Sequence, residues 1–143
     1  MSETSSRVIP MSYMGIPFSQ DPTGSRAAIL GIPFDCGTHP TRIGARQGPD
    51  AIRTQSSLVR PYYPPDFDFN PLELLNLVDC GNVGCVAGEV ESAMTKIESA
   101  VSEICQAGVV PVTMGGDGLV SLPQLRALSK LHTDLALVQI DAH

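Results

Sequence analysis

Four short apolar segments constrain the fold of this chain more than any other feature. Each is followed by a turn or a polar loop, and they cover residues 27–32, 74–79, 109–114 and 135–140. Runs this short and this apolar are typical of strands that are buried on both faces of a sheet. Because helical patterns separate these segments, we expect an α/β fold with a largely parallel central sheet.

Three helices are expected between the strands. Pro49 and Pro123 each suit the first position of a helix, and they predict helices over about 49–59 and 123–131. The clearest helix covers about 88–107, where apolar residues recur at intervals of four and three and form one stripe. We interpret this stripe as a core face and not as a cofactor site. It consists of Val90, Met94, Ile97, Val101 and Ile104.

Size and charge disfavour several classes of function. The chain has 143 residues, and we divide it into an N-terminal arm, 1–26, and part of one α/β domain, 27–143. Nine Lys and Arg against 15 Asp and Glu give a net charge of −6, without any basic run, so we expect no binding to nucleic acid or anionic membranes. No apolar stretch approaches the roughly 20 residues that span a bilayer. The N-terminus also lacks a signal-peptide pattern, so we expect a cytoplasmic location.

The cysteines are interpreted as free thiols. A chain that is not a small secreted scaffold rarely depends on disulfides. No second closely spaced pair accompanies Cys80 and Cys85, so a zinc knot is not predicted. The four cysteines are Cys36, Cys80, Cys85 and Cys105.

Three polar loops follow predicted strands, and together they predict a functional site. The loops cover residues 35–48, 115–118 and 141–143. In an open parallel sheet, ligands bind beyond the carboxyl ends of the strands. Since all three loops leave from those ends, we expect them to meet at one edge of the sheet.

Asp141 and His143 are the candidate metal ligands. They stand two positions apart at the end of an apolar run, and residues with this spacing project to the same side of a strand. A carboxylate paired with an imidazole suits Mn, Fe, Zn or Ni better than Ca or Mg. Metal sites use about four to six donors, so this pair alone is insufficient. The alternative is a solvated acid beside a surface histidine.

The other polar residues have structural alternatives. The run 115–118, Gly-Gly-Asp-Gly, allows a tight turn but lacks the Lys-Ser/Thr of a phosphate-binding loop. Arg42, Arg46 and Arg53 could bind an anion or a substrate carboxylate, but such residues more often anchor loops through hydrogen bonds. No Ser-His-Asp or Cys-His arrangement is evident, so we assign no catalytic residue.

In order and spacing, several of these motifs resemble the ureohydrolases, the family of arginase, agmatinase and guanidinobutyrase. Within that family, 13–17 and 122–127 look most like agmatinase, and the resemblance covers about 13–143. It implies a three-layer α/β/α fold with a mostly parallel sheet, incomplete in this chain. The segments that carry the resemblance are 31–35, 42–53, 115–117 and 141–143.

The resemblance also implies a reaction. In the family, two Mn²⁺ ions lower the pKa of a shared water, and the resulting hydroxide attacks a guanidinium carbon so that urea and an amine leave. Agmatine, which gives putrescine, or a close analogue is the implied substrate, with Ni²⁺ or Zn²⁺ as alternative metals. Asp141 resembles a bridging ligand and His143 a ligand of the second metal. A homotrimer or homohexamer is implied, with the Tyr- and Pro-rich segment 60–71 as a candidate contact.

This chain departs from the family pattern at two positions. Gly118 stands where the family has a metal-binding histidine, and Asn82 stands where aspartate is commoner. The family's further ligands would follow residue 143. We therefore expect this chain by itself to be inactive. The alternatives are a non-catalytic relative with a degraded metal site, or a hydrolase of guanidinobutyrate, guanidine or a formimino compound.

Overall fold

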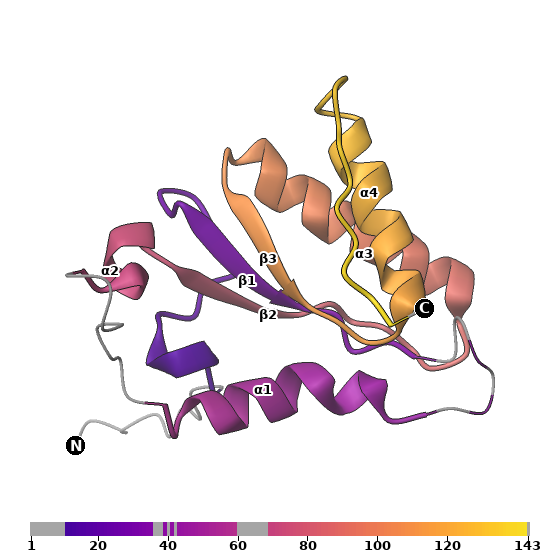
Figure 1. The fold of residues 1–143 in the computed structure, drawn as a ribbon, viewed down its shortest axis with the longest axis horizontal. Helices are drawn as coiled ribbons and strands as arrows, with labels where there is room; N and C mark the ends of the chain where they lie inside the picture. Colours follow the sequence, from indigo (N-terminus) through magenta and orange to yellow (C-terminus); the bar gives the residue numbers. More distant parts are fainter. Residues whose placement is uncertain (1–10, 36–38, 40, 42, 60–68, 143) are drawn as a thin grey trace, which may run out of the picture.

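A parallel three-stranded sheet positions the loops that follow β1 and β3. The computed structural model describes residues 11–35, 39, 41, 43–59 and 69–142. Strands β1 (Ala27–Gly31), β2 (Val78–Asn82) and β3 (Val110–Met114) pair in the order β2-β1-β3 (Figure 1). The expected parallel sheet is confirmed for these strands.

Helices cover both faces of the sheet and make three layers (Figure 1). Helices α3 (Val90–Gln106) and α4 (Ser121–Ser129) pack against each other on one face. Helix α1 (Gly48–Ser56) lies on the other face with the 3-10 turn η1 (Tyr13–Gly15). The expected α/β/α arrangement is therefore confirmed. No helix in the described part of the chain is both long and apolar enough to cross a membrane.

The core divides between the two faces as the alternation of strand side chains requires. Ala28 and Leu30 of β1 contribute to the cluster on the α3 side, and Ala27 and Ile29 contribute to the cluster on the other side. The expected stripe of α3 is confirmed as a core face, although Val90 at its first turn is only partly buried. Burial of this kind is worth about 25 cal/mol per Å² of apolar area.

Strand β2 begins later than the sequence predicts. Residues 74–79 are expected to form a strand, but the short helix α2 (Pro71–Leu75) occupies the first part of that range. The Asn70 side chain accepts a hydrogen bond from the Leu72 N–H at 3.0 Å, and Pro71 suits the first helical position. Local capping therefore outweighs the strand propensity of the apolar run.

The expected fourth strand is absent, so this prediction is wrong. Residues 135–140 belong to no helix or strand in the structure, and Val138 and Ile140 are 84% and 97% exposed. In Figure 1 this segment runs back from the turn after α4 toward the start of that helix. Apolar composition predicts that a segment is buried, but a strand also needs a neighbour that pairs its peptide groups.

The described cysteines are free thiols, as expected. Cys80, Cys85 and Cys105 are half-buried and form no disulfide. Burial raises the pKa of each thiol, and the neighbouring Asp79 carboxylate adds to the rise at Cys80. A raised pKa lowers the fraction of reactive thiolate at neutral pH. Cys36 and most of the segment 60–71 lie outside the described residues.

Candidate functional site

The loop after β1 is anchored by a buried carboxylate. Asp35 accepts hydrogen bonds from the Gly44 N–H at 2.7 Å, from the Arg46 N–H at 3.1 Å and from Arg46 Nε at 2.7 Å. The Arg46 guanidinium also forms an ion pair with this carboxylate. Charge-assisted bonds of this kind are stronger than neutral ones. Arg46 therefore anchors the loop, as the structural interpretation of the arginines predicts.

The glycine turn after β3 packs directly against the loop after β1. A Cβ atom on Gly116 would lie 1.5 Å from the Phe34 carbonyl oxygen, a distance that no side chain can occupy. The Asp117 N–H donates to the same carbonyl at 3.0 Å. A Cβ atom on Gly48 would lie 3.1 Å from the Gly115 carbonyl oxygen, which confirms the expected meeting of the loops 35–48 and 115–118 for their described residues. Gly116 makes this approach sterically feasible.

The last two residues of the glycine turn begin a helical turn. The Asp117 carboxylate accepts a hydrogen bond from the Leu119 N–H at 3.1 Å and caps the 3-10 turn η3 (Gly118–Val120). Gly118 is exposed and has no side chain that could bind a metal. Residue 118 therefore forms part of a backbone turn at the carboxyl end of the sheet and provides no side-chain ligand for a metal ion.

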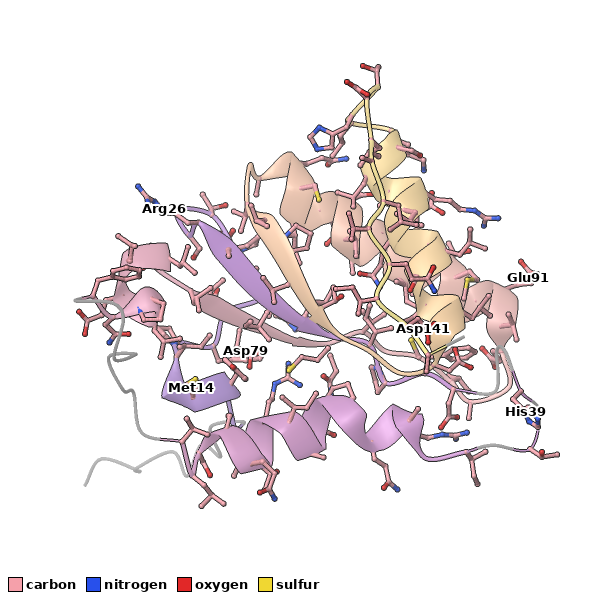
Figure 2. The ribbon with its side chains drawn as sticks, in the orientation of Figure 1. Met14, Arg26, His39, Asp79, Glu91 and Asp141 are labelled. Atoms are coloured by element: carbon pink, nitrogen blue, oxygen red, sulfur yellow. The ribbon has the colours of Figure 1, made fainter. Side chains whose placement is uncertain are left out.

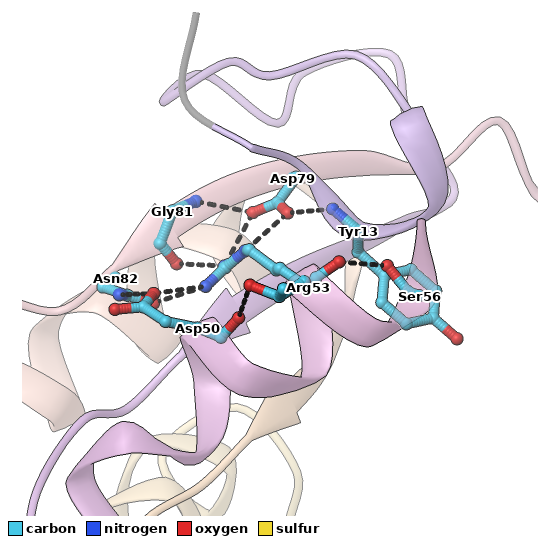
Figure 3. A network of polar contacts seen from close by, with 8 residues as sticks. Tyr13, Asp50, Arg53, Ser56, Asp79, Gly81 and Asn82 are labelled. Atoms are coloured by element: carbon cyan, nitrogen blue, oxygen red, sulfur yellow. Dashed lines mark hydrogen bonds and ion pairs between the residues drawn. The ribbon is translucent and has the colours of Figure 1, made fainter. Parts of the chain in front are cut away.

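Arg53 lies at the centre of a buried polar network beside β2 (Figure 3). Its Nε and Nη2 atoms donate to the two oxygens of Asp79, both at 2.8 Å. Its Nη1 atom donates to the Asn82 side-chain oxygen at 2.6 Å, and Nη2 also donates to the Gly81 carbonyl at 3.0 Å. Asn82 in turn donates to Asp50 at 2.8 Å. Arg53 is thus occupied by protein acceptors, which confirms the anchoring interpretation.

The Asp79 carboxylate joins three segments of the chain. Besides Arg53, it accepts hydrogen bonds from the Tyr13 N–H at 2.8 Å and from the Gly81 N–H at 2.9 Å. Its burial acts to raise the pKa of Asp79, but the bonds from Arg53, Tyr13 and Gly81 outweigh burial and lower that pKa. Asp79 is therefore an ionised structural group. Neither Asp35 nor Asp79 was singled out from the sequence, although Asp35 lies shortly after β1 and Asp79 lies within β2.

A cavity of about 520 Å³ borders this network but lies apart from the predicted site. It opens beside β2 and is lined by apolar, polar and acidic side chains. Neither Asp35, nor the turn 115–118, nor Asp141 lines it. The residues around it include Met11, Phe18, Asp50, Thr54, Cys80 and Asn82.

Asp141 lies at the predicted end of the sheet, but without an assembled metal site. Figure 2 places it near the start of α4, at the same end as His39 of the loop after β1. Its side chain accepts a hydrogen bond from Gln139 at 3.0 Å. Among the described residues, no three His, Cys, Asp or Glu side chains lie close enough together to hold a metal ion. His143 lies outside the described residues, so its assignment with Asp141 as metal ligands stays a prediction.

Comparison with models of protein families shows the family to which the chain belongs. The model of the arginase family matches residues 25–143. This chain belongs to the arginase family. It is 38% identical over 135 residues to a guanidinobutyrase of Pseudomonas aeruginosa, a match that covers 92% of the chain and 42% of that enzyme. It is 35% identical over 132 residues to the human mitochondrial guanidino acid hydrolase, and this match covers 92% of the chain and 37% of that protein.

Solved structures agree with this family membership and with the fold. A proclavaminate amidino hydrolase from Streptomyces clavuligerus superposes with a TM-score of 0.80 at 30% identity, over 91% of this chain and 42% of that one. A formiminoglutamase from Trypanosoma cruzi, solved with two Mn²⁺ ions, superposes with a TM-score of 0.63 at 29% identity, over 74% of this chain and 35% of that one. The expected arginase-like fold is confirmed, and the chain spans about two fifths of the length of these relatives.

Proposed function

We propose that this chain supplies the N-terminal part of a C–N hydrolase that acts on a guanidino compound. The observation that carries the proposal is the contact between the loop after β1 and the glycine turn after β3, at the carboxyl end of a parallel sheet in an arginase-family chain. Relatives with the names guanidinobutyrase, guanidino acid hydrolase and agmatinase support this substrate class.

The described residues do not by themselves fit the two-metal centre that the family implies. Gly118 offers no donor atom, and the Asp117 carboxylate caps a helical turn. Asp141 is carried by an exposed segment and is hydrogen-bonded to Gln139. We therefore derive no catalytic step through a metal, and we propose that this chain alone hydrolyses no guanidino compound.

The role we propose for the chain's own residues is to position the loops of a larger site. The ion pair of Asp35 with Arg46 holds the loop after β1, and Gly116 lets the turn after β3 pack against it. The network of Arg53 and Asp79 holds α1 against β2. Among the described residues, no buried side-chain polar atom lacks a hydrogen-bond partner, so we assign none of these anchors to the substrate.

Two alternatives remain proposals of their own. Gly118 favours a non-catalytic member of the family, because the side chain at that position cannot bind metal. The substrate could also be guanidinobutyrate, guanidine or a formimino compound. The identities of 38% to a guanidinobutyrase and 36% to a Salmonella agmatinase are too similar to choose between these substrates.

Urea or amine release tests the proposal directly. The chain and a longer parent protein would each be incubated with agmatine, 4-guanidinobutyrate, guanidine and formiminoglutamate, in the presence of Mn²⁺, Ni²⁺ or Zn²⁺. We expect turnover of one guanidino compound by the longer protein and none by this chain. Turnover by the chain alone would contradict the second expectation, and an inactive longer protein that still binds no metal would favour the non-catalytic alternative.

Elemental analysis separates the effect of Gly118 from other causes of inactivity. Gly118→His in the longer protein would restore the family's residue, and we expect it to raise the metal content. Gly84→His is the matched control, because Gly84 is exposed like Gly118 and a Cβ atom there would meet nothing within 4 Å. We further propose a cytoplasmic homo-oligomer that binds a small guanidino substrate, with light scattering as the measurement of its size.

A further inference from the structure

The cavity beside β2 is formed by three segments that are distant in the sequence. The N-terminal arm contributes Phe18 and Gln20, helix α1 contributes Asp50 and Thr54, and β2 contributes residues 79–82. The cavity measures about 520 Å³, and small-molecule sites typically measure about 300–1,000 Å³. Because β2 and β3 are the two outer strands of the sheet, this cavity lies at the opposite edge from the turn after β3.

The charges around the cavity disfavour an anion. Among the described residues that line it, Arg53 carries the only positive charge, and protein groups already use that charge. Arg53 donates four hydrogen bonds, which go to the Asp79 carboxylate, the Asn82 side chain and the Gly81 carbonyl. Arg53 and Asp79 neutralise each other, so the Asp50 carboxylate leaves the lining with a net negative charge. This balance favours a cation.

The Asp50 carboxylate has one oxygen that a ligand can use. Its Oδ1 atom accepts a hydrogen bond from the Asn82 amide at 2.8 Å and lies 3.7 Å from Arg53 Nη1 (Figure 3). The Asp50 side chain is 73% exposed, and no described residue donates to its Oδ2 atom. One turn later, Thr54 Oγ1 donates to the Asp50 carbonyl at 2.9 Å and keeps its lone pairs as acceptors. One open carboxylate oxygen suits a compact ammonium group, whereas a guanidinium group binds best to both oxygens.

Phe18 gives the cavity an aromatic and apolar wall. A Cβ atom on Gly81 would lie 3.0 Å from Phe18 Cε2, so the ring packs against the Gly81 backbone. The Phe18 side chain remains 41% exposed, and Met11, which also lines the cavity, is 56% exposed. An aromatic ring attracts a cation that lies over its face within about 6 Å of its centre. The apolar surface beside the ring suits a short aliphatic chain.

Backbone hydrogen bonds hold this wall in place without a ligand. The Asp79 N–H donates to the Pro17 carbonyl at 2.9 Å, and the Ser19 N–H donates to the Asp79 carbonyl at 3.0 Å. Phe18, which lies between these two bonds, therefore forms an isolated parallel bridge with Asp79. A site that is formed before binding loses less conformational entropy when the ligand arrives.

We propose that this cavity binds a primary alkylammonium ion. The ammonium group donates to Asp50 Oδ2 and to the Thr54 hydroxyl, and the alkyl chain lies against Phe18 and Met11. A bound ion joins the N-terminal arm to α1, so it stabilises the docked arm. The inference rests on the contacts around this cavity and holds whether or not the proposed hydrolase function is correct.

A series of four ligands with the same alkyl chain tests the proposal on the unaltered chain. The compounds n-butylammonium, n-butylguanidinium, n-butanol and butyrate would be titrated and followed by the NMR shifts of amides 18–20, 50–54 and 79–82. For so small a ligand, we expect n-butylammonium to bind with a Kd in about the millimolar range. We expect the neutral and anionic compounds to bind at least about tenfold more weakly. Equal affinities for all four compounds, or tighter binding of n-butylguanidinium, would overturn the proposal.

Asp50→Asn tests the carboxylate at the centre of the proposed site. The variant keeps an oxygen that can accept the bond from Asn82 but removes the negative charge. We expect n-butylammonium to bind about fivefold more weakly, and this difference should shrink at high salt. Asp134→Asn, at an exposed residue that does not line the cavity, is the matched control and should bind as the unaltered chain does. Equal affinities of the two variants would overturn the role of Asp50.

Phe18→Leu tests the aromatic wall and keeps it apolar. We expect the affinity for n-butylammonium to fall about threefold, because the attraction between the cation and the ring is lost. The affinity for n-butanol should stay unchanged, which separates this effect from a general loosening of the arm. Equal losses for the two ligands would overturn the role of the ring.

Hydrogen exchange tests the link between the ligand and the arm without any variant. The Ser19 and Asp79 amides donate the two bonds that dock the arm on β2. With n-butylammonium at ten times its Kd, we expect their exchange to slow about tenfold, because the ion binds only while the arm is docked. The same concentration of n-butanol is the control and should change little. Unchanged exchange in the presence of n-butylammonium would overturn the proposal.

Discussion

The two outer edges of the sheet differ sharply. On the β2 side, the N-terminal arm covers the edge: the Asp79 N–H donates to the Pro17 carbonyl at 2.9 Å, and the Ser19 N–H donates to the Asp79 carbonyl at 3.0 Å. On the β3 side, no strand of the described chain is paired and two valines are exposed. The two strands also differ in composition: β2 carries the polar Asp79, whereas β3 is mostly apolar. A strand edge is closed by a segment that is itself held in place, and here Asp79 and Arg53 hold the arm.

The largest expected effect is on the closed side, at Arg53. Arg53→Ala would leave the buried Asp79 carboxylate without its cation, and such losses cost about 3–5 kcal/mol. We expect a fall of this size in the free energy of unfolding, measured by urea titration with circular dichroism, since the chain has no tryptophan. Arg126→Ala, at an exposed residue of α4, is the matched control and should change little. Equal effects of the two variants would contradict the central role of Arg53.

Gly116 gives the next largest effect, at the contact between the two loops. A Cβ atom there would meet the Phe34 backbone, which cannot move aside as a flexible side chain could. We expect Gly116→Ala to lower the free energy of unfolding by about 3 kcal/mol. Gly84→Ala, where a Cβ meets nothing within 4 Å, should be nearly neutral. If Gly116→Ala were tolerated equally well, the close approach of the loops would be wrong.

A smaller effect is expected at Asn82, where the amide lies between Arg53 and Asp50. Asn82→Asp would replace the N–H donor to Asp50 with a second carboxylate, and we expect a loss of about 1 kcal/mol at neutral pH. The double variant with Asp50→Asn should recover most of this loss. Additive effects of the two substitutions would show that the residues are not coupled.

The smallest change in the free energy of unfolding is expected when the pH is varied near neutrality. The pKa of Asp79 is lowered below 3.8 in the folded chain. Between this lowered pKa and 3.8, the unfolded chain therefore binds more protons at Asp79 than the folded chain does. The stabilisation by Asp79 is therefore fully present well above pH 3.8 and is lost as the pH falls through the lowered pKa. Urea titrations between pH 2 and 7 should show this fall only at the acid end. An unchanged acid limb in Asp79→Asn would refute the assignment to Asp79.

Local patterns in the sequence predict single helices better than contacts between residues that are distant in the sequence. The stripe of α3 was predictable because its periodicity requires no knowledge of distant residues. The sequence predicts that Arg53 anchors the fold through hydrogen bonds. Its partner Asp79 lies 26 positions away, so local patterns do not identify it. The same limit explains the error at 135–140: an apolar run indicates that a segment can pair, and only the three-dimensional arrangement determines whether it does.

The candidate site likewise combines features that local sequence predicts with features that depend on the three-dimensional arrangement. The tight turn at 115–118 was predictable from its glycines, but the contact of Gly116 with Phe34 depends on two strands lying side by side. The start of α2 depends on capping by Asn70, a local signal that competes with the strand propensity of the apolar residues that follow it. Metal ligation by Asp141 and His143 stays a prediction, since it depends on donors that local patterns cannot supply.

The position of Asp79 between three distant segments also has a consequence for the order of folding. Tyr13 and Asp79 are 66 positions apart, so their bond closes a long loop and forms late compared with the local turns of α3. During synthesis the arm has to wait until β2 has left the ribosome before it can dock. For that interval residues 13–19 are accessible to proteases and chaperones, although in the finished fold Ile16 is buried.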